Sequence, residues 1–115
     1  MSEQHLSAQQ LIQVAKEFGT PVYVYHAEKI AAQYKKLTTA FSKSNVVFFY
    51  ACKALTNISV IKYLHSLGAS IDCSSINEAK LALHAGFLPQ NVLYTSNGIG
   101  FDEIEEAVTL GVNIN

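Results

Sequence analysis

Two hydrophobic periods alternate along the chain. Apolar residues spaced three or four apart predict amphipathic helices at residues 7–18, 30–41, 58–67, 77–85 and 102–110. Short runs rich in β-branched and aromatic residues predict strands at residues 21–26, 46–51, 70–73, 91–95 and 112–115. Glycines follow four of the helical segments, at positions 19, 68, 86 and 111, where they are typical helix stops. The pattern therefore indicates an α/β fold.

From residue 46 onward strands and helices alternate regularly. Successive strands begin 24, 21 and 21 residues apart, which accommodates one strand, one helix and two short loops each time. Such spacing predicts a parallel sheet with right-handed crossovers, and residues 46–51, apolar throughout, predict a strand covered on both faces. An open doubly wound sheet and a closed (β/α)8 barrel both satisfy this pattern.

The end of the chain bears on that choice. The sequence has 115 residues and stops within its fourth parallel strand, whereas a (β/α)8 barrel needs eight units and about 250 residues. We therefore expect the chain to be the front part of something larger, with a small self-contained α/β domain as the alternative.

Composition narrows the class of protein. Half of the residues are hydrophobic and 15% are charged, which excludes a disordered chain. Eight lysines, no arginine and a net charge of -1 argue against nucleic acid as a partner. The longest apolar run, residues 46–52, is far shorter than the roughly 18 residues of a membrane span, and the first residues form no signal peptide. We expect a cytoplasmic protein that does not contact a membrane.

The remaining polar and sulfur-containing positions suggest structural roles. Cys52 and Cys73 form no CxxC motif, and each closes a predicted strand, so we expect reduced core thiols. No histidines are spaced as metal ligands, so no metal site is assigned. The loop from Thr95 to Gly100 lacks the third glycine of a dinucleotide motif and the Walker lysine, and is interpreted as a turn.

Three residues could carry chemistry. Lys53 directly follows the apolar segment 46–52, at the carboxyl end of a predicted parallel strand, where α/β folds place their active sites. Apolar surroundings disfavour the charged form of an amine and so favour Schiff-base formation, although an ordinary lysine reaching into solvent also fits. Asp72 ends the next strand, and we expect its carboxylate roughly 3 to 6 Å from the Lys53 amine, in direct or one-water hydrogen-bond reach. Glu78 lies three residues after Ser75, so capping a helix explains it as well as a catalytic role does.

These residues lie within a longer set of motifs. The chain resembles the amino-terminal part of the diaminopimelate decarboxylases, in the alanine-racemase-like class of pyridoxal-phosphate enzymes. The resemblance rests on Gly-Thr-Pro-Val-Tyr-Val-Tyr at 19–25, on Tyr-Ala-Cys-Lys-Ala at 50–54, and on Gly-Ala-Ser-Ile-Asp-Cys-Ser-Ser at 68–75 followed by Glu78. It implies that residues 27–115 begin a pyridoxal-phosphate-binding (β/α)8 barrel, and that residues 1–26 supply a lead helix and a strand to a second, mostly β domain.

The resemblance also implies a function. Lys53 would bind pyridoxal 5'-phosphate as a Schiff base, and Asp72 and Glu78 would contact or tune it. The reaction would be decarboxylation of meso-2,6-diaminopimelate to L-lysine and CO2, the last step of lysine biosynthesis, by an enzyme that is a homodimer when complete. Alternatives are a decarboxylase of the same class acting on carboxynorspermidine, ornithine or arginine, or an inactive self-associating fragment, because family segments for phosphate and the partner subunit are absent from these 115 residues.

Overall fold

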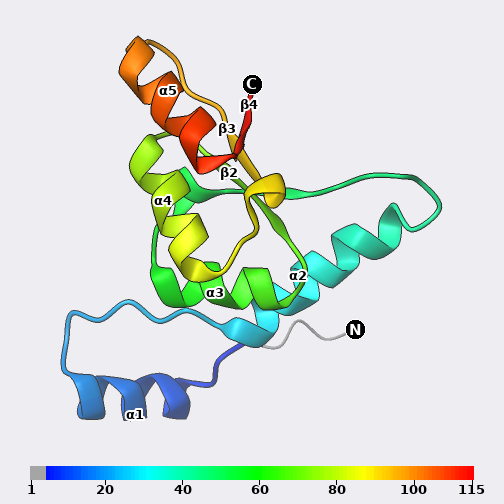
Figure 1. Ribbon diagram of the computed structural model, residues 1–115. Coiled ribbons are helices and arrows are strands. Elements are labelled where there is room, and N and C mark those ends of the chain that lie inside the picture. Colours follow the sequence, from blue (N-terminus) through cyan, green and yellow to red (C-terminus); the bar gives the residue numbers. More distant parts are fainter. Residues whose placement is uncertain (1–4) are drawn as a thin grey trace. The chain divides into compact units, whose positions relative to one another are not determined.

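The computed structural model describes residues 5–115 and divides the chain into two compact units, residues 1–40 and 41–115 (Figure 1). No helix in residues 5–115 has the length and apolar character needed to cross a membrane.

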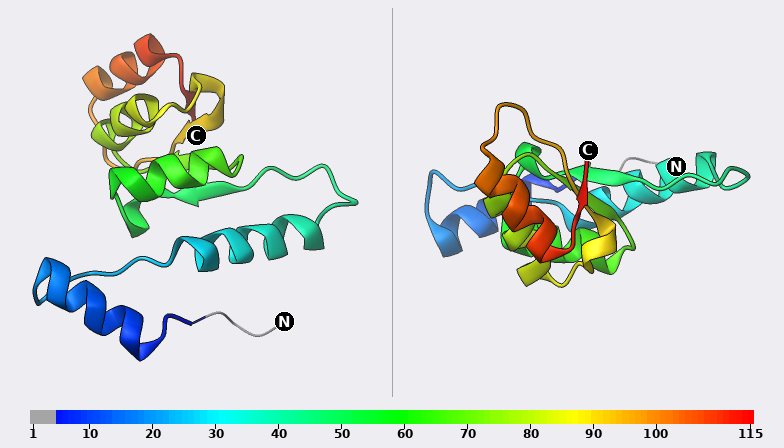
Figure 2. Two further views of the ribbon diagram at one scale, coloured as in Figure 1. Left: turned by 90° about the horizontal axis from the view of Figure 1, so that it is seen from below. Right: turned by 45° about the horizontal axis from the view of Figure 1, so that its top comes forward.

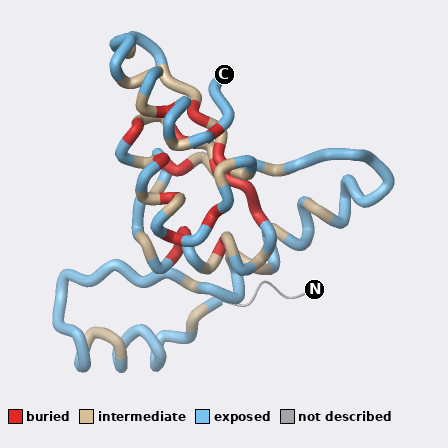
Figure 3. Tube along the Cα trace, viewed as in Figure 1, coloured by how far each residue is buried: buried red, intermediate tan, exposed pale blue. Residues whose placement is uncertain are grey.

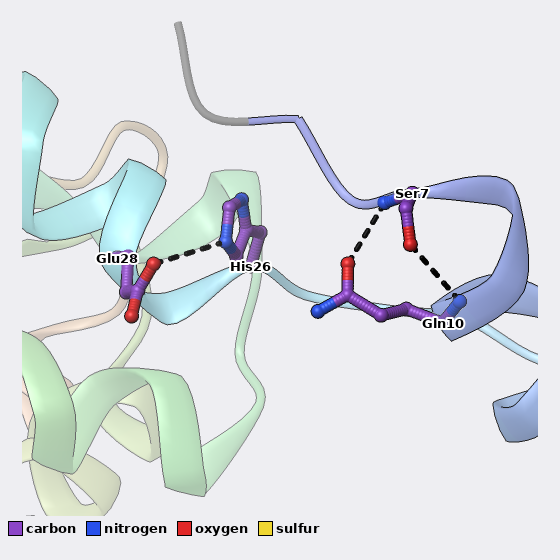
Figure 4. A network of polar contacts seen from close by, with 4 residues as sticks. All are labelled: Ser7, Gln10, His26 and Glu28. Carbon is purple, nitrogen blue, oxygen red and sulfur yellow. Dashed lines mark hydrogen bonds and ion pairs between the residues drawn. The ribbon is translucent and has the colours of Figure 1, made fainter.

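The first unit contains helices α1 (Ala8–Phe18) and α2 (Ala27–Ala40). Ser7 caps α1, since its hydroxyl accepts a hydrogen bond from the Gln10 N–H at 3.2 Å, while the Ser7 N–H donates to the Gln10 side chain at 2.8 Å (Figure 4). This reciprocal pair is a capping box, as the sequence predicted. Before α2, the His26 side chain lies 3.7 Å from the Glu28 carboxylate (Figure 4).

The strand predicted at residues 21–26 does not form. The structure has no strand there, and Tyr23 is 89% exposed. A strand needs a neighbour to satisfy its backbone hydrogen-bonding groups, and the sheet of residues 41–115 does not include this segment. The prediction that residues 21–26 lie outside the run of parallel strands agrees with that sheet, but their place in a second β domain stays a prediction.

The second unit contains a parallel sheet whose strand order follows the sequence. Four strands pair in the order β1-β2-β3-β4, and every pair is parallel, which confirms the predicted topology. They are β1 (Phe49–Ala51), β2 (Ser70–Cys73), β3 (Val92–Tyr94) and β4 (Asn113–Ile114). The connections carry helices α3 (Ile58–Ser66), α4 (Ile76–Ala85) and α5 (Phe101–Leu110), and two 3-10 turns, η1 (Cys52–Ala54) and η2 (Pro89–Asn91).

One face of this sheet is the core of the second unit. Right-handed crossovers between sequential strands place their helices on the same side, and α4 packs on β2 and β3 (Figure 2). Ile71, Cys73, Val92 and Tyr94 alternate onto that side and are fully buried, as the tube in Figure 3 shows along β2 and β3. Residues of the opposite face, such as Phe49 and Leu93, are partly exposed. The sheet therefore has one covered and one open face.

The first strand differs from its prediction. The expected strand spanned residues 46–51 and was covered on both faces, whereas β1 begins at Phe49 and Val47 is 64% exposed. β1 pairs with β2 alone, so it is an edge strand of this sheet. Its last bond toward the amino end is the one that the Phe48 carbonyl accepts from the Ser70 N–H at 3.1 Å, and residues 46 and 47 lie outside the pairing. Phe48 instead packs edge to face against Phe41, with ring centroids 5.5 Å apart.

Local signals set most helix ends. Asn57 caps α3, accepting from the Ser59 and Val60 N–H groups at 3.0 and 3.2 Å, and Gly86 ends α4 with a φ of 108° that disfavours other residues. The start of the last helix differs slightly from the prediction, because α5 begins at Phe101, and the Gly100 N–H donates to the Glu103 carboxylate at 3.4 Å.

Candidate functional site

The candidate site lies at the carboxyl edge of the sheet, where parallel strands bring their following residues together. Ala51 at the end of β1 is the Cα partner of Asp72 in β2, and Asp72 in turn is the partner of Leu93 in β3. Lys53 follows Ala51 by two residues, within η1. The topology therefore brings the lysine-bearing turn and the end of β2 to one edge, as the sequence predicted.

A hydrogen-bonded turn holds Lys53 at this edge. The Leu55 N–H donates to the Cys52 carbonyl at 3.1 Å, and the Tyr50 hydroxyl donates to the Leu55 carbonyl at 3.0 Å. These two bonds bracket the lysine and fix its backbone. The Lys53 side chain itself is exposed, so the apolar walls expected around it are not formed by residues 5–115.

The Asp72 carboxylate is half-buried and lacks a partner. Its Oδ1 atom is buried and accepts no hydrogen bond. Among residues 5–115 no ion pair joins Asp72 to Lys53, so the direct contact is not made, and the water-bridged contact stays a prediction. Asp72 neither caps a helix nor points both its oxygens into solvent. An unpartnered buried carboxylate oxygen is costly, which makes this atom available for a ligand or a water molecule.

Glu78 is located in the first turn of α4, three residues after the N-cap Ser75, which is the position expected from the sequence. Its carboxylate accepts hydrogen bonds from the Ser74 N–H at 2.7 Å and the Ser74 hydroxyl at 3.1 Å. Its own N–H donates to the Ser75 hydroxyl at 3.2 Å. Glu78 therefore fastens the residues that follow Asp72 to the start of α4.

Cys52 and Cys73 are fully buried, as expected, but they form a cluster that the sequence analysis missed. Their sulfur atoms and a Glu78 carboxylate oxygen all lie within 4.8 Å of one another. Burial, and next the Glu78 charge, raise the pKa of the Cys52 thiol to about 11. Burial and the neighbouring Cys52 also raise the pKa of Cys73. One signal could have revealed the cluster, since Cys52 directly follows β1 and Cys73 ends the adjacent parallel strand β2.

Two further oxygens without partners lie at the end of β3. The Tyr94 hydroxyl and Thr95 Oγ1 are buried and make no hydrogen bond. The Thr95 N–H donates to the Cys73 carbonyl at 2.8 Å, so the β2–β3 ladder continues past Tyr94. The interpretation of residues 95–100 as a plain turn gave no reason to single out Thr95, because nothing in a sequence marks a hydroxyl as unpartnered.

This edge of the sheet offers the primary amine of Lys53, the Asp72 carboxylate and the unpaired hydroxyl of Thr95. A primary amine can attack a carbonyl carbon, and a nearby carboxylate can exchange protons with it. Such a set suits a ligand that carries an aldehyde.

Comparison with known proteins identifies the group to which the chain belongs. Residues 27–115 match the family model described as pyridoxal-dependent decarboxylase, pyridoxal binding domain. A diaminopimelate decarboxylase of Methanothermobacter thermautotrophicus is 43% identical over 106 residues, which cover 90% of this chain and 25% of that protein. The chain thus spans about a quarter of the length of the curated relatives it matches.

Solved structures agree with this match. The crystal structure of diaminopimelate decarboxylase from Helicobacter pylori complexed with L-lysine superposes with a TM-score of 0.83 at 30% identity, covering 91% of this chain and 27% of that one. A lysine/ornithine decarboxylase from Vibrio vulnificus complexed with putrescine gives a TM-score of 0.84 at 29% identity, with coverage of 95% and 30%. The chain therefore belongs to the pyridoxal-binding domain family of the pyridoxal-dependent decarboxylases.

Proposed function

We propose that this chain is part of a pyridoxal-phosphate-dependent decarboxylase that converts meso-2,6-diaminopimelate to L-lysine and CO2. One observation carries the proposal: Lys53 lies in the turn η1 that follows β1, at the strand edge shared with Asp72, within a chain that is 43% identical to a diaminopimelate decarboxylase. Because the chain spans a quarter of that relative, the reaction is proposed for the complete enzyme rather than for residues 1–115 alone.

The residues of the candidate site fit pyridoxal phosphate. The cofactor carries an aldehyde, and the exposed Lys53 amine at the end of β1 is a nucleophile suited to it. The buried and unpartnered Oδ1 of Asp72 offers a polar contact that residues 5–115 do not use. When bound, pyridoxal phosphate accepts the electron pair left behind as a carboxylate group departs as CO2.

Each of the three residues has a distinct role in this proposal. Lys53 binds the cofactor through Nζ and holds or releases a proton there when substrate enters. The Asp72 carboxylate accepts a hydrogen bond from an N–H group, directly or through water. Glu78 is a positioning residue, since its two hydrogen bonds with Ser74 hold the backbone that follows Asp72.

Substrate choice has one serious alternative. The likeness to the lysine/ornithine decarboxylase of Vibrio vulnificus, at a TM-score of 0.84, supports a decarboxylase of the same class that acts on ornithine, arginine or carboxynorspermidine. The greater identity to the Methanothermobacter thermautotrophicus relative favours diaminopimelate.

The proposal extends to architecture. The sequential parallel sheet, with helices on one face and an open opposite face, is the arrangement that opens a (β/α)8 barrel, in which the open face becomes the interior. The β domain that would include residues 1–26, the homodimer and the cytoplasmic location remain predictions. An inactive fragment is the alternative for residues 1–115 on their own.

The experiment that tests the proposal is a substrate panel with the complete enzyme. The purified protein, supplied with pyridoxal phosphate, is given meso-diaminopimelate, L-ornithine, L-arginine and carboxynorspermidine, and CO2 release is measured. We expect turnover with meso-diaminopimelate and at least about tenfold less with each of the others, a difference of about 1.4 kcal/mol in transition-state stabilisation. Preference for ornithine or arginine would establish the alternative, and no turnover with any of the four would refute a decarboxylase of this class.

A further inference from the structure

Three metal-binding side chains converge beneath the candidate site. The sulfurs of Cys52 and Cys73 and a carboxylate oxygen of Glu78 lie within 4.8 Å of one another. They come from three elements: Cys52 from η1, Cys73 from the end of β2, and Glu78 from the first turn of α4. Separate elements that deliver donors to one point resemble a built site more than a chance row along a single helix.

The spacing of these atoms approaches that of a tetrahedral metal centre. Zinc binds thiolate sulfur at about 2.3 Å and carboxylate oxygen at about 2.0 to 2.2 Å, so its tetrahedral ligands lie roughly 3.5 to 3.8 Å apart. Because the three ligand atoms lie at most 4.8 Å apart, each pair would have to approach by no more than about 1 Å to reach that spacing. Rotation of side chains at the start of α4 and at the two strand ends can supply such a change.

We propose that Cys52, Cys73 and Glu78 form a binding site for a thiophilic divalent cation, with Zn²⁺ as its simplest occupant. Two sulfurs and one oxygen are a ligand set that zinc accepts, and the fourth position is left for water. A disulfide between the cysteines would use the two sulfurs alone, whereas a cation uses all three atoms. The site goes beyond the proposed decarboxylation, which does not require a metal.

The geometry of the cluster favours a cation there. Cys52 and Cys73 are fully buried, and the half-buried Glu78 carboxylate lies within 4.8 Å of both sulfurs. A negatively charged carboxylate at this point stabilises a divalent ion, whose binding displaces the two thiol protons. Glu78 keeps its hydrogen bonds with Ser74 through Oε2, so its other oxygen is the natural ligand.

A bound cation would act on the neighbouring residues. Cys52 directly precedes Lys53, and Cys73 directly follows Asp72, so a metal ion bridging the two thiolates would tie the lysine turn to the end of β2. We therefore expect Zn²⁺ to change the affinity of the complete enzyme for pyridoxal phosphate.

Crystals of the complete enzyme, soaked in Zn²⁺ without added cofactor, provide the direct test. Anomalous diffraction on the two sides of the zinc absorption edge should place an ion bonded to both sulfur atoms and to Glu78. Absence of a peak there, or zinc found only at other residues, would overturn the proposal. Because this measurement needs no substitution, it does not depend on whether a variant folds.

Cd²⁺ titration in solution adds a second test. Thiolate-to-cadmium charge-transfer absorption should appear at one equivalent, and Cys52→Ala should remove it, whereas the matched control His84→Gln, at an exposed α4 position, should retain it. Glu78→Gln, which preserves an oxygen acceptor for Ser74, should weaken Cd²⁺ binding at least tenfold. Equal Cd²⁺ binding by the parent protein and Cys52→Ala would contradict the site. Failure of decarboxylation with Cd²⁺ binding intact would refute only the proposed function.

Discussion

Asp72 in β2 is the Cα partner of Ala51 in β1, and Lys53 follows Ala51 by two residues, in the turn η1. The Oδ1 atom of Asp72 is buried without a hydrogen bond at that point. A buried carboxylate oxygen without a hydrogen bond destabilises the fold. The pairing of β1 with β2 therefore places an oxygen that needs a hydrogen-bond donor beside the turn that carries Lys53. This relationship is the basis of the first two predictions.

Replacement of Lys53 by alanine should abolish cofactor binding and turnover in the complete enzyme. Alanine has no amine to combine with the cofactor aldehyde, so turnover should fall at least about a thousandfold, roughly 4 kcal/mol of transition-state stabilisation. The measurements are pyridoxal phosphate absorbance retained through gel filtration and CO2 release. Lys62→Ala, which removes an exposed lysine of α3, is the matched control and should behave as the parent. Cofactor absorbance undiminished in Lys53→Ala would assign the role to another lysine.

Asp72→Asn should leave the fold intact but slow the reaction. Asparagine nearly matches aspartate in size, so the β2 pairings with Ala51 and Leu93 should persist. Loss of the negative charge beside the lysine turn should lower kcat at least about tenfold, about 1.4 kcal/mol. Circular dichroism reports the fold and steady-state kinetics reports kcat. A variant that turns over at the parent rate would remove Asp72 from the catalytic site and leave Lys53 alone.

Glu78 provides a prediction that separates its two roles. Glu78→Ala removes the acceptor of two Ser74 hydrogen bonds and should lower the stability of the α4 start by about 1 to 2 kcal/mol, whereas Glu78→Gln should retain most of it. If Glu78 positions the residues after Asp72 for the cofactor, the alanine variant should also bind pyridoxal phosphate several-fold more weakly. Hydrogen exchange of α4 measures the first effect, and cofactor titration the second. If the alanine variant shows weaker hydrogen-exchange protection of α4 but unchanged affinity for pyridoxal phosphate, Glu78 has only a structural role at the start of α4.

Parallel topology could be predicted from sequence because each βα unit repeats a local pattern. β2 forms at the predicted residues 70–73, since the alternation of polar and apolar residues in Ser-Ile-Asp-Cys and the nearby Gly68 are local signals. Residues 21–26 have equally strong β propensity, yet they form no strand. A strand also requires a neighbouring strand to pair with, and the β propensity of a segment does not specify one. The same reason explains why β1 is shorter than its apolar run.

The part of the site that could be predicted from the sequence is the part that depends only on the order and direction of the strands. The approach of Lys53 to the end of β2 follows from two parallel strands that end at the same edge. The meeting of Cys52, Cys73 and Glu78 depends additionally on the direction in which the first turn of α4 leaves β2. That direction is set by packing against the sheet, which is a tertiary property and has no signature in residue spacing.

Asn57→Ala should weaken α3 locally. The Asn57 Oδ1 accepts from the Ser59 and Val60 N–H groups, at 3.0 and 3.2 Å, and alanine leaves both without a partner in the first turn. Loss of an N-cap costs about 1 kcal/mol, so the amides of α3 should exchange about fivefold faster in hydrogen-exchange mass spectrometry of the complete enzyme. Asn57→Ser, which restores a capping oxygen, should recover most of the protection. Asn77→Ala, an exposed position within α4, is the matched control and should leave exchange in α3 unchanged, because alanine is the better helix former there. If Asn57→Ala exchanges at the parent rate, the cap contributes nothing to α3, and packing of its buried residues Val60, Ile61 and Leu64 alone must hold the helix on the sheet.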